Sequence, residues 1–284
     1  MLSLTLVGAD ADAAQTAARK LGMSGEWLGP NALDVQIDGE IAGRRAQLDA
    51  ELEGLAVDYC VQAAEGRRKR LFVADMDSTI IGCECLDELA DFAGLKDEIA
   101  AITERAMRGE IEFEGALRER VGKLKGLGLD ALQRAYDERV RLNPGAETLV
   151  RTMAAHGTRC ILVSGGFTFF TSRVAAAAGF HANRANTLID DGAALSGLVG
   201  EPILGKQAKL DALNDEAAAL GIALSATMAV GDGANDLAMI QAAGLGVAYR
   251  AKPVVAAQAD CRIDHADLTA VLYFQGYRAE DFRA

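Results

Sequence analysis

Two aspartates stand directly after the short apolar run Leu71–Ala74, in the sequence Asp75-Met76-Asp77-Ser78-Thr79. A carboxylate can act as a nucleophile and accept a phosphoryl group directly. A second carboxyl group is then needed, because the leaving oxygen must be protonated and a water must later be deprotonated. Asp75 and Asp77 are candidates for these two roles. Taken alone, the pair is more typical of a capped turn after a strand, for which Asp and Ser are ordinary choices.

A second acidic cluster, Gly231-Asp232-Gly233-Ala234-Asn235-Asp236, also follows an apolar run. If it lies beside Asp75 and Asp77, four carboxylates share one pocket and repel each other unless a cation is present. An oxygen-only donor set suits Mg²⁺, and no His or Cys cluster indicates zinc. A solvated loop with an N-capping aspartate would explain Asp236 but leaves Asp232 without a role.

Two further features could hold an anionic substrate. Ser164-Gly165-Gly166 offers a hydroxyl and backbone N–H groups, which we expect at a helix N-terminus, where anions bind. Lys206 and Lys209 open the helix before the Asp232 strand, and either could supply a cation to the phosphate and to Asp75. Each feature is weak by itself, because glycines after strands are common and lysines usually lie on solvated faces.

These residues need a sheet that brings them together. Continuous apolar runs at 71–74, 160–163, 228–230 and 246–248 alternate with helical segments, one of them capped by Asn143-Pro144 and ended by Gly157. The alternation predicts a doubly wound, Rossmann-like α/β core with a parallel sheet. Since the carboxyl ends of parallel strands meet at one crevice, Asp75, Ser164 and Asp232 should converge there.

Two stretches depart from this alternation. Residues 84–140 contain no strand-like run and should form a helical insertion of three or four helices, the last opened by a capping box at Asp130–Gln133. Around Asp190-Asp191-Gly192, short β-type runs predict a hairpin within residues 186–199.

The first 66 residues should form a separate small α+β domain. Leu2–Val7 and Leu33–Ile37 are typical of strands, and Asp10–Leu21 and Ile41–Ala64 of helices. The basic run Arg67–Arg70 that follows is expected to be a solvated linker.

Composition narrows the class of partner. With 41 acidic against 29 basic residues the net charge is −12, which disfavours a nucleic-acid surface. No apolar run is long enough to span a membrane, and the first ten residues carry no leader pattern. Five cysteines without a C-x-x-C pair are typical of reduced thiols, so we expect a cytoplasmic protein.

In their order and separation, the motifs resemble those of the haloacid-dehalogenase (HAD) superfamily of phosphatases and, within it, the phosphoserine phosphatases. They are DxDST at 75–79, SGG at 164–166, a lysine at 209 and GDGxND at 231–236, and the resemblance runs from about residue 70 to about residue 275. It implies a HAD core of residues 70–83 and 141–284 with a helical cap of residues 84–140.

The resemblance also implies the roles of individual residues. Asp75 would be the nucleophile, Asp77 the general acid/base, and Lys209 the cation that assists them. Mg²⁺ would be held by Asp75, the backbone carbonyl of Asp77 and Asp232, with Asp236 supporting its waters. The substrate phosphate would lie against Ser164, Gly165, Lys209 and Asn235.

The cap would select the substrate. Glu84 matches the position of a glutamate that binds an ammonium group, and Arg120 that of an arginine that binds a carboxylate. Met107 and Phe113 match apolar cap contacts. Without the resemblance, Glu84 and Arg120 would be interpreted as solvent-facing helix charges.

The implied function is magnesium-dependent hydrolysis of O-phospho-L-serine to L-serine, the last step of serine biosynthesis, through a phospho-aspartate on Asp75. The alternative is a HAD phosphatase or phosphotransferase that acts on another small phosphorylated metabolite. Residues 1–66 loosely resemble an ACT-type regulatory module, or a degenerate form with two strands instead of four, and a homodimer is possible.

Overall fold

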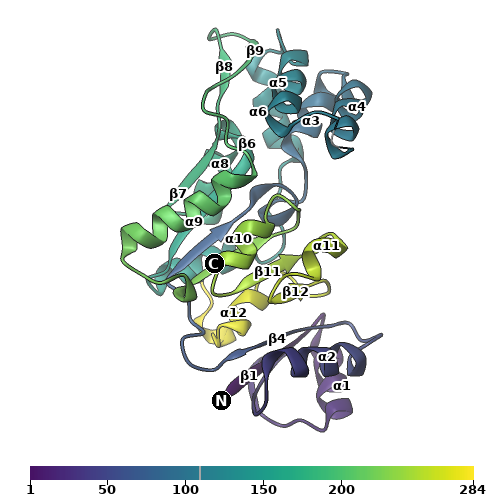
Figure 1. Ribbon diagram of the computed structural model, residues 1–284, viewed down its shortest axis with the longest axis vertical. Helices are drawn as coiled ribbons and strands as arrows, with labels where there is room; N and C mark the ends of the chain where they lie inside the picture. Colours follow the sequence, from purple (N-terminus) through teal and green to yellow (C-terminus); the bar gives the residue numbers. More distant parts are fainter. Residues whose placement is uncertain (109) are drawn as a thin grey trace.

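A computed structural model describes residues 1–108 and 110–284. Three regions are stacked along its long axis in Figure 1: the N-terminal region at the bottom, an α/β core in the middle and a helical region at the top. Within the described residues, no helix is both long and apolar enough to cross a membrane.

The core is built on a parallel sheet with strand order β12-β11-β10-β5-β6-β7. In chain order its strands are β5 (Leu71–Ala74), β6 (Arg159–Phe167), β7 (Ala182–Asn186), β10 (Thr227–Gly231), β11 (Gly246–Tyr249) and β12 (Cys261–Ile263).

Helices cover both faces of this sheet. One face carries α7 (Ala146–Ala155), α8 (Thr168–Ala178) and α12 (Ala270–Phe274), and the other α9 (Lys206–Leu220), α10 (Leu237–Ala242) and α11 (Pro253–Ala256). The strand β5 shows the reason, because Phe72 and Ala74 pack into the first apolar cluster and Leu71 and Val73 into the second. A strand buried on both faces must be apolar throughout. The predicted doubly wound core is confirmed.

Two details of the predicted core are wrong. The helix α7 begins at Ala146, after Gly145 at φ 80°, and not at Asn143-Pro144. Asn143 instead donates from Nδ2 to the carbonyl oxygen of Thr79 at 2.8 Å. The strand β6 continues to Phe167 past an irregularity in its pairing, so Ser164-Gly165-Gly166 lies in the last part of a strand and not at a helix N-terminus.

The N-terminal region is an antiparallel sheet of order β2-β3-β1-β4 with two helices, in the βαββαβ sequence of ferredoxin-like folds. Its elements are β1 (Leu2–Gly8), α1 (Ala11–Leu21), β2 (Glu26–Gly29), β3 (Ala32–Ile37), α2 (Ile41–Glu51) and β4 (Val57–Ala63).

The expectation of two strands and a helix to Ala64 is therefore wrong. The helix α2 ends at Glu51, the chain turns through Gly54 at φ 79°, and the remaining residues form β4. Val, Tyr and Cys in Val57–Ala63 suit a strand that is covered on both sides. The sheet packs Leu4 and Leu6 against its own helices and Val7 and Cys60 against the core.

The basic run is solvated only in part, because Arg68 and Arg70 are exposed and the other two side chains are not. Arg67 bonds Asp34 at 2.8 Å, and Lys69 is 7% exposed with its Nζ bonded to the carbonyl oxygen of Ser225 at 2.9 Å. Arg67 and Lys69 thus connect the N-terminal sheet to the core, because one bonds a strand of that sheet and the other bonds the core.

Residues 84–140 are helical, as expected. They hold α3 (Cys85–Phe92), α4 (Lys96–Met107), α5 (Phe113–Lys123) and α6 (Leu129–Arg139). The predicted capping box is wrong, because Gly128 precedes α6 and Asp130 already lies in its first turn. The hairpin is confirmed as β8 (Leu188–Asp190) and β9 (Leu195–Val199), and it packs beside α5 (Figure 1).

Candidate active site

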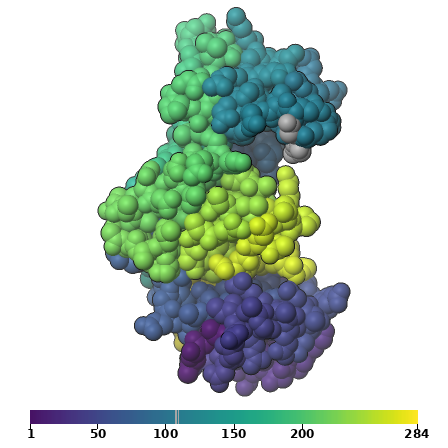
Figure 2. Space-filling view, in the orientation of Figure 1, coloured from purple at the N-terminus to yellow at the C-terminus, as the bar shows by residue number. Residues whose placement is uncertain are grey.

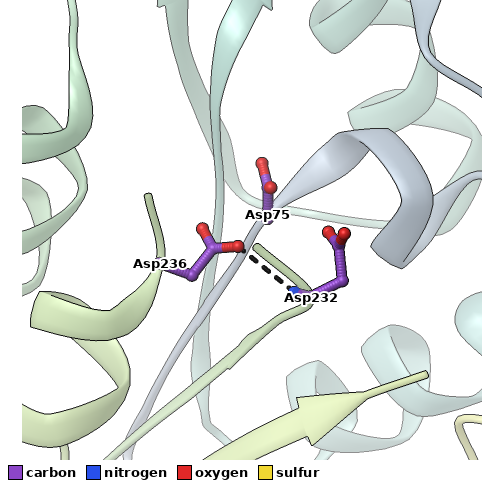
Figure 3. A group of neighbouring side chains, drawn as sticks. All are labelled: Asp75, Asp232 and Asp236. Carbon is purple, nitrogen blue, oxygen red and sulfur yellow. Dashed lines mark hydrogen bonds between the residues drawn. The ribbon is translucent and has the colours of Figure 1, made fainter. Parts of the chain in front are cut away.

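Asp75 and Asp232 lie just beyond the ends of β5 and β10, which are neighbours at the middle of the sheet. From β5 the chain continues to β6 on one side, and from β10 to β11 on the other. Such a change of direction leaves a crevice outside the carboxyl ends of the two strands. Figure 3 shows the side chains of Asp75 and Asp232 close together beyond the ends of these strands.

Lys209 joins Asp75 to Asp236 in the floor of the crevice. Its Nζ lies 2.7 Å from Asp75 Oδ2 and 2.5 Å from Asp236 Oδ1, and all three side chains are buried. Burial would lower the pKa of Lys209, but the two carboxylates raise it above the ordinary lysine value, so the side chain stays charged. Lys206, the other lysine considered, is exposed.

Asp236 is held by more than the lysine. Its Oδ2 accepts hydrogen bonds from the backbone N–H groups of Asp232 at 3.2 Å and Gly233 at 2.9 Å. A Cβ atom on Gly231 would come within 2.5 Å of its Cγ, so only glycine permits this close approach. Asp236 therefore fixes the shape of the loop that carries Asp232.

The floor suits a divalent cation. One carboxylate oxygen each from Asp75, Asp232 and Asp236 lie within 4.8 Å of one another (Figure 3). Burial and the charge of Asp236 raise the pKa of Asp75 well above its usual range, against the effect of Lys209. Such a surplus of buried negative charge calls for a cation, and a set of oxygen donors matches Mg²⁺.

Asp77 turns back over the same crevice. Ser78 adopts the left-handed φ of 55°, which redirects the chain within the π-type turn Met76–Ile80. Asp77 then accepts hydrogen bonds from Cys85 N at 2.9 Å and from Ser164 Oγ at 3.0 Å. Burial raises its pKa despite these bonds, which suits a group that must hold and release a proton.

Above the floor, a cavity of about 310 Å³ extends to the helical region. Figure 2 shows the hollow between the teal helical region and the yellow-green core. From the helical side it is lined by Glu84, Asp87, Thr103, Phe113 and Arg120.

Glu84 and Arg120 are opposite charges in this cavity. Glu84 accepts a hydrogen bond from Ser78 Oγ at 2.7 Å. Desolvation by the surrounding protein and the charge of Asp77 raise its pKa to about 7. Arg120 is half-buried, and within the described residues its guanidinium donates only to Ala116 O at 3.3 Å and Thr103 Oγ1 at 3.5 Å.

The lack of an ion pair sets Arg120 apart from its neighbours. The other arginines between residues 96 and 139 each have a carboxylate within 4.0 Å: Arg105, Arg108, Arg118, Arg134 and Arg139. Among the described residues, Arg120 has none at that distance. A guanidinium that faces a cavity without a counter-ion is suited to bind an anionic ligand.

Most of the predicted site residues meet around this cavity. Its lining includes Asp75, Asp77, Glu84, Phe113, Arg120, Ser164, Gly165, Asp232 and Asn235. Lys209 and Asp236 lie buried beneath it. The side chain of Met107 falls outside the part of the chain that the structure describes.

Three polar lining residues were not predicted: Asp87, Thr103 and Lys252. Asp87 follows Glu84 by three residues, and this helical spacing could have indicated a shared face. Lys252 donates its backbone N–H to the carbonyl oxygen of Asp232 at 3.1 Å. No signal in the sequence connects Thr103 or Lys252 with the motifs, because both depend on how distant segments pack.

The doubly wound sheet, the acidic crevice at its switch point and the helical region above it define an α/β enzyme of the phosphoryl-transfer type. A family model described as haloacid dehalogenase-like hydrolase matches residues 72–241. The chain belongs to this family.

Individual relatives agree with the family. The chain is 43% identical over 257 residues to a phosphoserine phosphatase of Streptomyces coelicolor, which covers 89% of this chain and 62% of the relative, less than two thirds of its length. It is 44% identical over 224 residues to a phosphoserine phosphatase of Polaromonas, covering 77% of this chain and 95% of the relative. The crystal structure of a probable phosphoserine phosphatase from Vibrio cholerae superposes with a TM-score of 0.80 at 31% identity, over 98% of this chain and 88% of the other.

Proposed function

We propose that this protein is a phosphoserine phosphatase, which hydrolyses O-phospho-L-serine to L-serine and phosphate, the last step of serine biosynthesis. One observation carries the proposal: a single cavity combines a buried Asp75–Lys209 floor with Glu84 and with Arg120, which has no carboxylate within 4.0 Å among the described residues. The phosphate would lie on the floor, the carboxylate against Arg120 and the ammonium against Glu84. The printed names of the relatives at 43% and 44% identity support the same substrate.

The first half of the reaction forms a covalent intermediate. The carboxylate of Asp75 attacks phosphorus in line, and the phosphoryl group passes from the serine oxygen to Asp75. Asp77 gives its proton to the departing oxygen, so L-serine leaves neutral at that atom. Lys209 keeps Asp75 oriented, while Ser164, Gly165 and Asn235 would hold the phosphoryl oxygens.

The second half restores the enzyme. Asp77, now a carboxylate, takes a proton from a water, and the resulting nucleophile attacks the phosphorus of the phospho-aspartate. The bond to Asp75 breaks and inorganic phosphate leaves. The hydrogen bonds that Asp77 accepts from Cys85 N and Ser164 Oγ orient its carboxylate toward the crevice.

Asp75, the backbone carbonyl of Asp77 and Asp232 would hold Mg²⁺, with Asp236 as the support of this loop. When bound, the ion supplies positive charge that offsets the charge of the phosphoryl oxygens.

The organisation of the chain is part of the proposal. We take residues 1–66 as an ACT-like domain, residues 70–83 and 141–284 as the catalytic core, and residues 84–140 as the cap over the site. A cytoplasmic location is supported by five free cysteines in the described chain. A homodimer stays a prediction from the sequence.

Phosphate release from O-phospho-L-serine tests the function directly. It should depend on Mg²⁺, exceed release from phosphothreonine and sugar phosphates, and disappear in Asp75→Asn but not in the control Asp91→Asn on the outer part of α3. Turnover of other phosphates without phosphoserine would support the alternative substrate. Turnover of none would contradict a catalytic role.

A further inference from the structure

The cap side of the cavity holds one more carboxylate than an amino acid requires. Arg120 and Glu84 suffice for one carboxylate and one ammonium, yet Asp87 lines the same cavity. Asp87 lies in the first turn of α3, is exposed, and has no ion pair within 4.0 Å among the described residues. Its neighbours on the helix, Glu88 and Asp91, both pair with Arg139 on the side away from the cavity.

Asp87 acts on both recognition residues. Burial lowers the pKa of Arg120, and the negative charge of Asp87 opposes this more strongly than that of Glu84. The same charge contributes to the raised pKa of Glu84, after desolvation, Asp77 and Asp232. Asp87 is therefore near enough to affect the net charge that a ligand meets on the cap side of the cavity.

That net charge depends on Asp87 because the charges of Arg120 and Glu84 oppose each other. The guanidinium of Arg120 stays positive, and the raised pKa of Glu84 weakens its negative charge. Arg120 and Glu84 by themselves therefore supply no net negative charge to repel a phosphate ester with a bare carboxylate. Adding the carboxylate of Asp87 makes the three groups net negative.

We propose that Asp87 is a specificity-determining residue, which makes the cap side of the cavity net negative and so selects phosphate esters with an ammonium beside the carboxylate against those without one. This inference rests on the proposed function and adds to it a way in which the site excludes phosphate esters that lack an ammonium group. A site discriminates by repelling the wrong ligand as well as by attracting the right one.

The test compares two ligands of nearly equal shape. O-Phospho-L-serine and 3-phosphoglycerate differ at the central carbon, which carries an ammonium in one and a hydroxyl in the other. The measured quantity is the ratio of their kcat/KM values. In Asp87→Asn, attraction of the ammonium weakens and repulsion of the lone carboxylate is relieved, so both effects lower the ratio, by roughly fivefold to tenfold.

Two matched variants identify the cause. Asp87→Glu keeps the charge and should retain a ratio close to that of the unmodified protein. Asp91→Asn removes the same charge from the same helix away from the cavity and should leave the ratio unchanged. Hydrolysis of p-nitrophenyl phosphate, which has neither group, reports whether each variant keeps an intact floor.

An unchanged ratio in Asp87→Asn would overturn the inference, as would an equal fall in Asp91→Asn, which would indicate a general charge effect. Failure of the proposed function looks different. In that case the unmodified protein itself shows no preference for phosphoserine over 3-phosphoglycerate.

Discussion

The two sides of the cleft hold their charges in different ways. In the core, Lys209 lies 2.7 Å from Asp75 and 2.5 Å from Asp236, and all three are buried. On the cap side, Glu84 is exposed to the cavity, and the guanidinium of Arg120 makes long hydrogen bonds of 3.3 and 3.5 Å. Buried charges in short contacts are costly to separate, whereas partly solvated ones rearrange easily. The core side thus holds its charges in a fixed arrangement, whereas the charges of the helical side can adjust to a ligand.

If the core performs the chemistry, removing its nucleophile should cause the largest loss of activity. The loss should be the same for every substrate. Asp75→Asn keeps the shape but replaces the attacking carboxylate with an amide. We expect kcat/KM to fall by about 10⁴-fold or more for phosphoserine and for p-nitrophenyl phosphate alike. Steady-state kinetics with both substrates measure this. A loss confined to phosphoserine would make Asp75 a recognition residue. It would contradict the division between a core that carries out the chemistry and a helical side that binds the substrate.

Next in size is the cost of breaking the buried triad. Lys209→Met leaves Asp75 and Asp236 facing each other without their cation. The free energy of unfolding should fall by about 3–5 kcal/mol. Urea denaturation in the presence of a chelator measures it, with Lys206→Met as the control on the exposed face of the same helix. Equal stability of the two variants would mean that the buried contacts of Lys209 with Asp75 and Asp236 stabilise the fold no more than the partly solvated charges of the cap side do.

On the cap side, Arg120→Ala should affect phosphoserine alone. Loss of a partly desolvated partner for the substrate carboxylate should lower kcat/KM for phosphoserine by roughly 100-fold. Hydrolysis of p-nitrophenyl phosphate should continue, because this substrate has no carboxylate. Arg118→Ala is the matched control, since Arg118 lies on the same helix and pairs with Glu201 outside the cavity. Parallel losses on both substrates would show that the cap takes part in the chemistry.

The smallest expected effect is a pH dependence of recognition. The pKa of Glu84 is raised to about 7, so its carboxylate is lost as the pH falls through that value. The ratio of kcat/KM for phosphoserine to that for p-nitrophenyl phosphate should therefore fall below pH 7, by at most about tenfold per pH unit. Glu84→Gln should flatten the ratio, and Glu88→Gln should not. A ratio that stays level in the unmodified enzyme would remove Glu84 from ammonium recognition.

The same raised pKa has a consequence for stability. A carboxyl group whose pKa is higher in the folded than in the unfolded protein binds more protons when folded. Ionisation of Glu84 therefore destabilises the fold as the pH rises from its ordinary value of 4.5 through about 7. Because the side chain is exposed to the cavity, solvent reduces the size of this effect.

Local patterns in the sequence predicted the core well. Apolar runs of strand length at 71–74 and 228–230 appear as β5 and β10, and the aspartates that follow them converge as expected. Physical reasons that act over a few residues explain this success, because a strand buried on both faces has little choice but to be apolar. The prediction was weaker where local signals compete. The segment Val57–Ala63 was expected to continue a helix and is a strand paired with β1.

Around the site, the motifs identified the groups that meet but not their partners. Ser164 was expected at a helix N-terminus and lies in β6, where it donates to Asp77 at 3.0 Å. Lys206 and Lys209 could not be separated by spacing, and the structure buries only Lys209. The burial of Lys209 depends on which face of α9 packs on the sheet, and that packing is determined by the whole core.

By itself, the sequence determined the order of chemical groups along the chain: two aspartates after one strand, a serine and glycines in the last part of another, and a second acidic loop after a third. Covalent order and short-range periodicity are enough for that. Only the tertiary structure decided the charge balance of the cleft. It places Asp87 at the cavity and leaves Arg120 without an ion pair among the described residues. It also joins Arg67 to the N-terminal sheet and Lys69 to the core, because such contacts connect residues far apart in the chain.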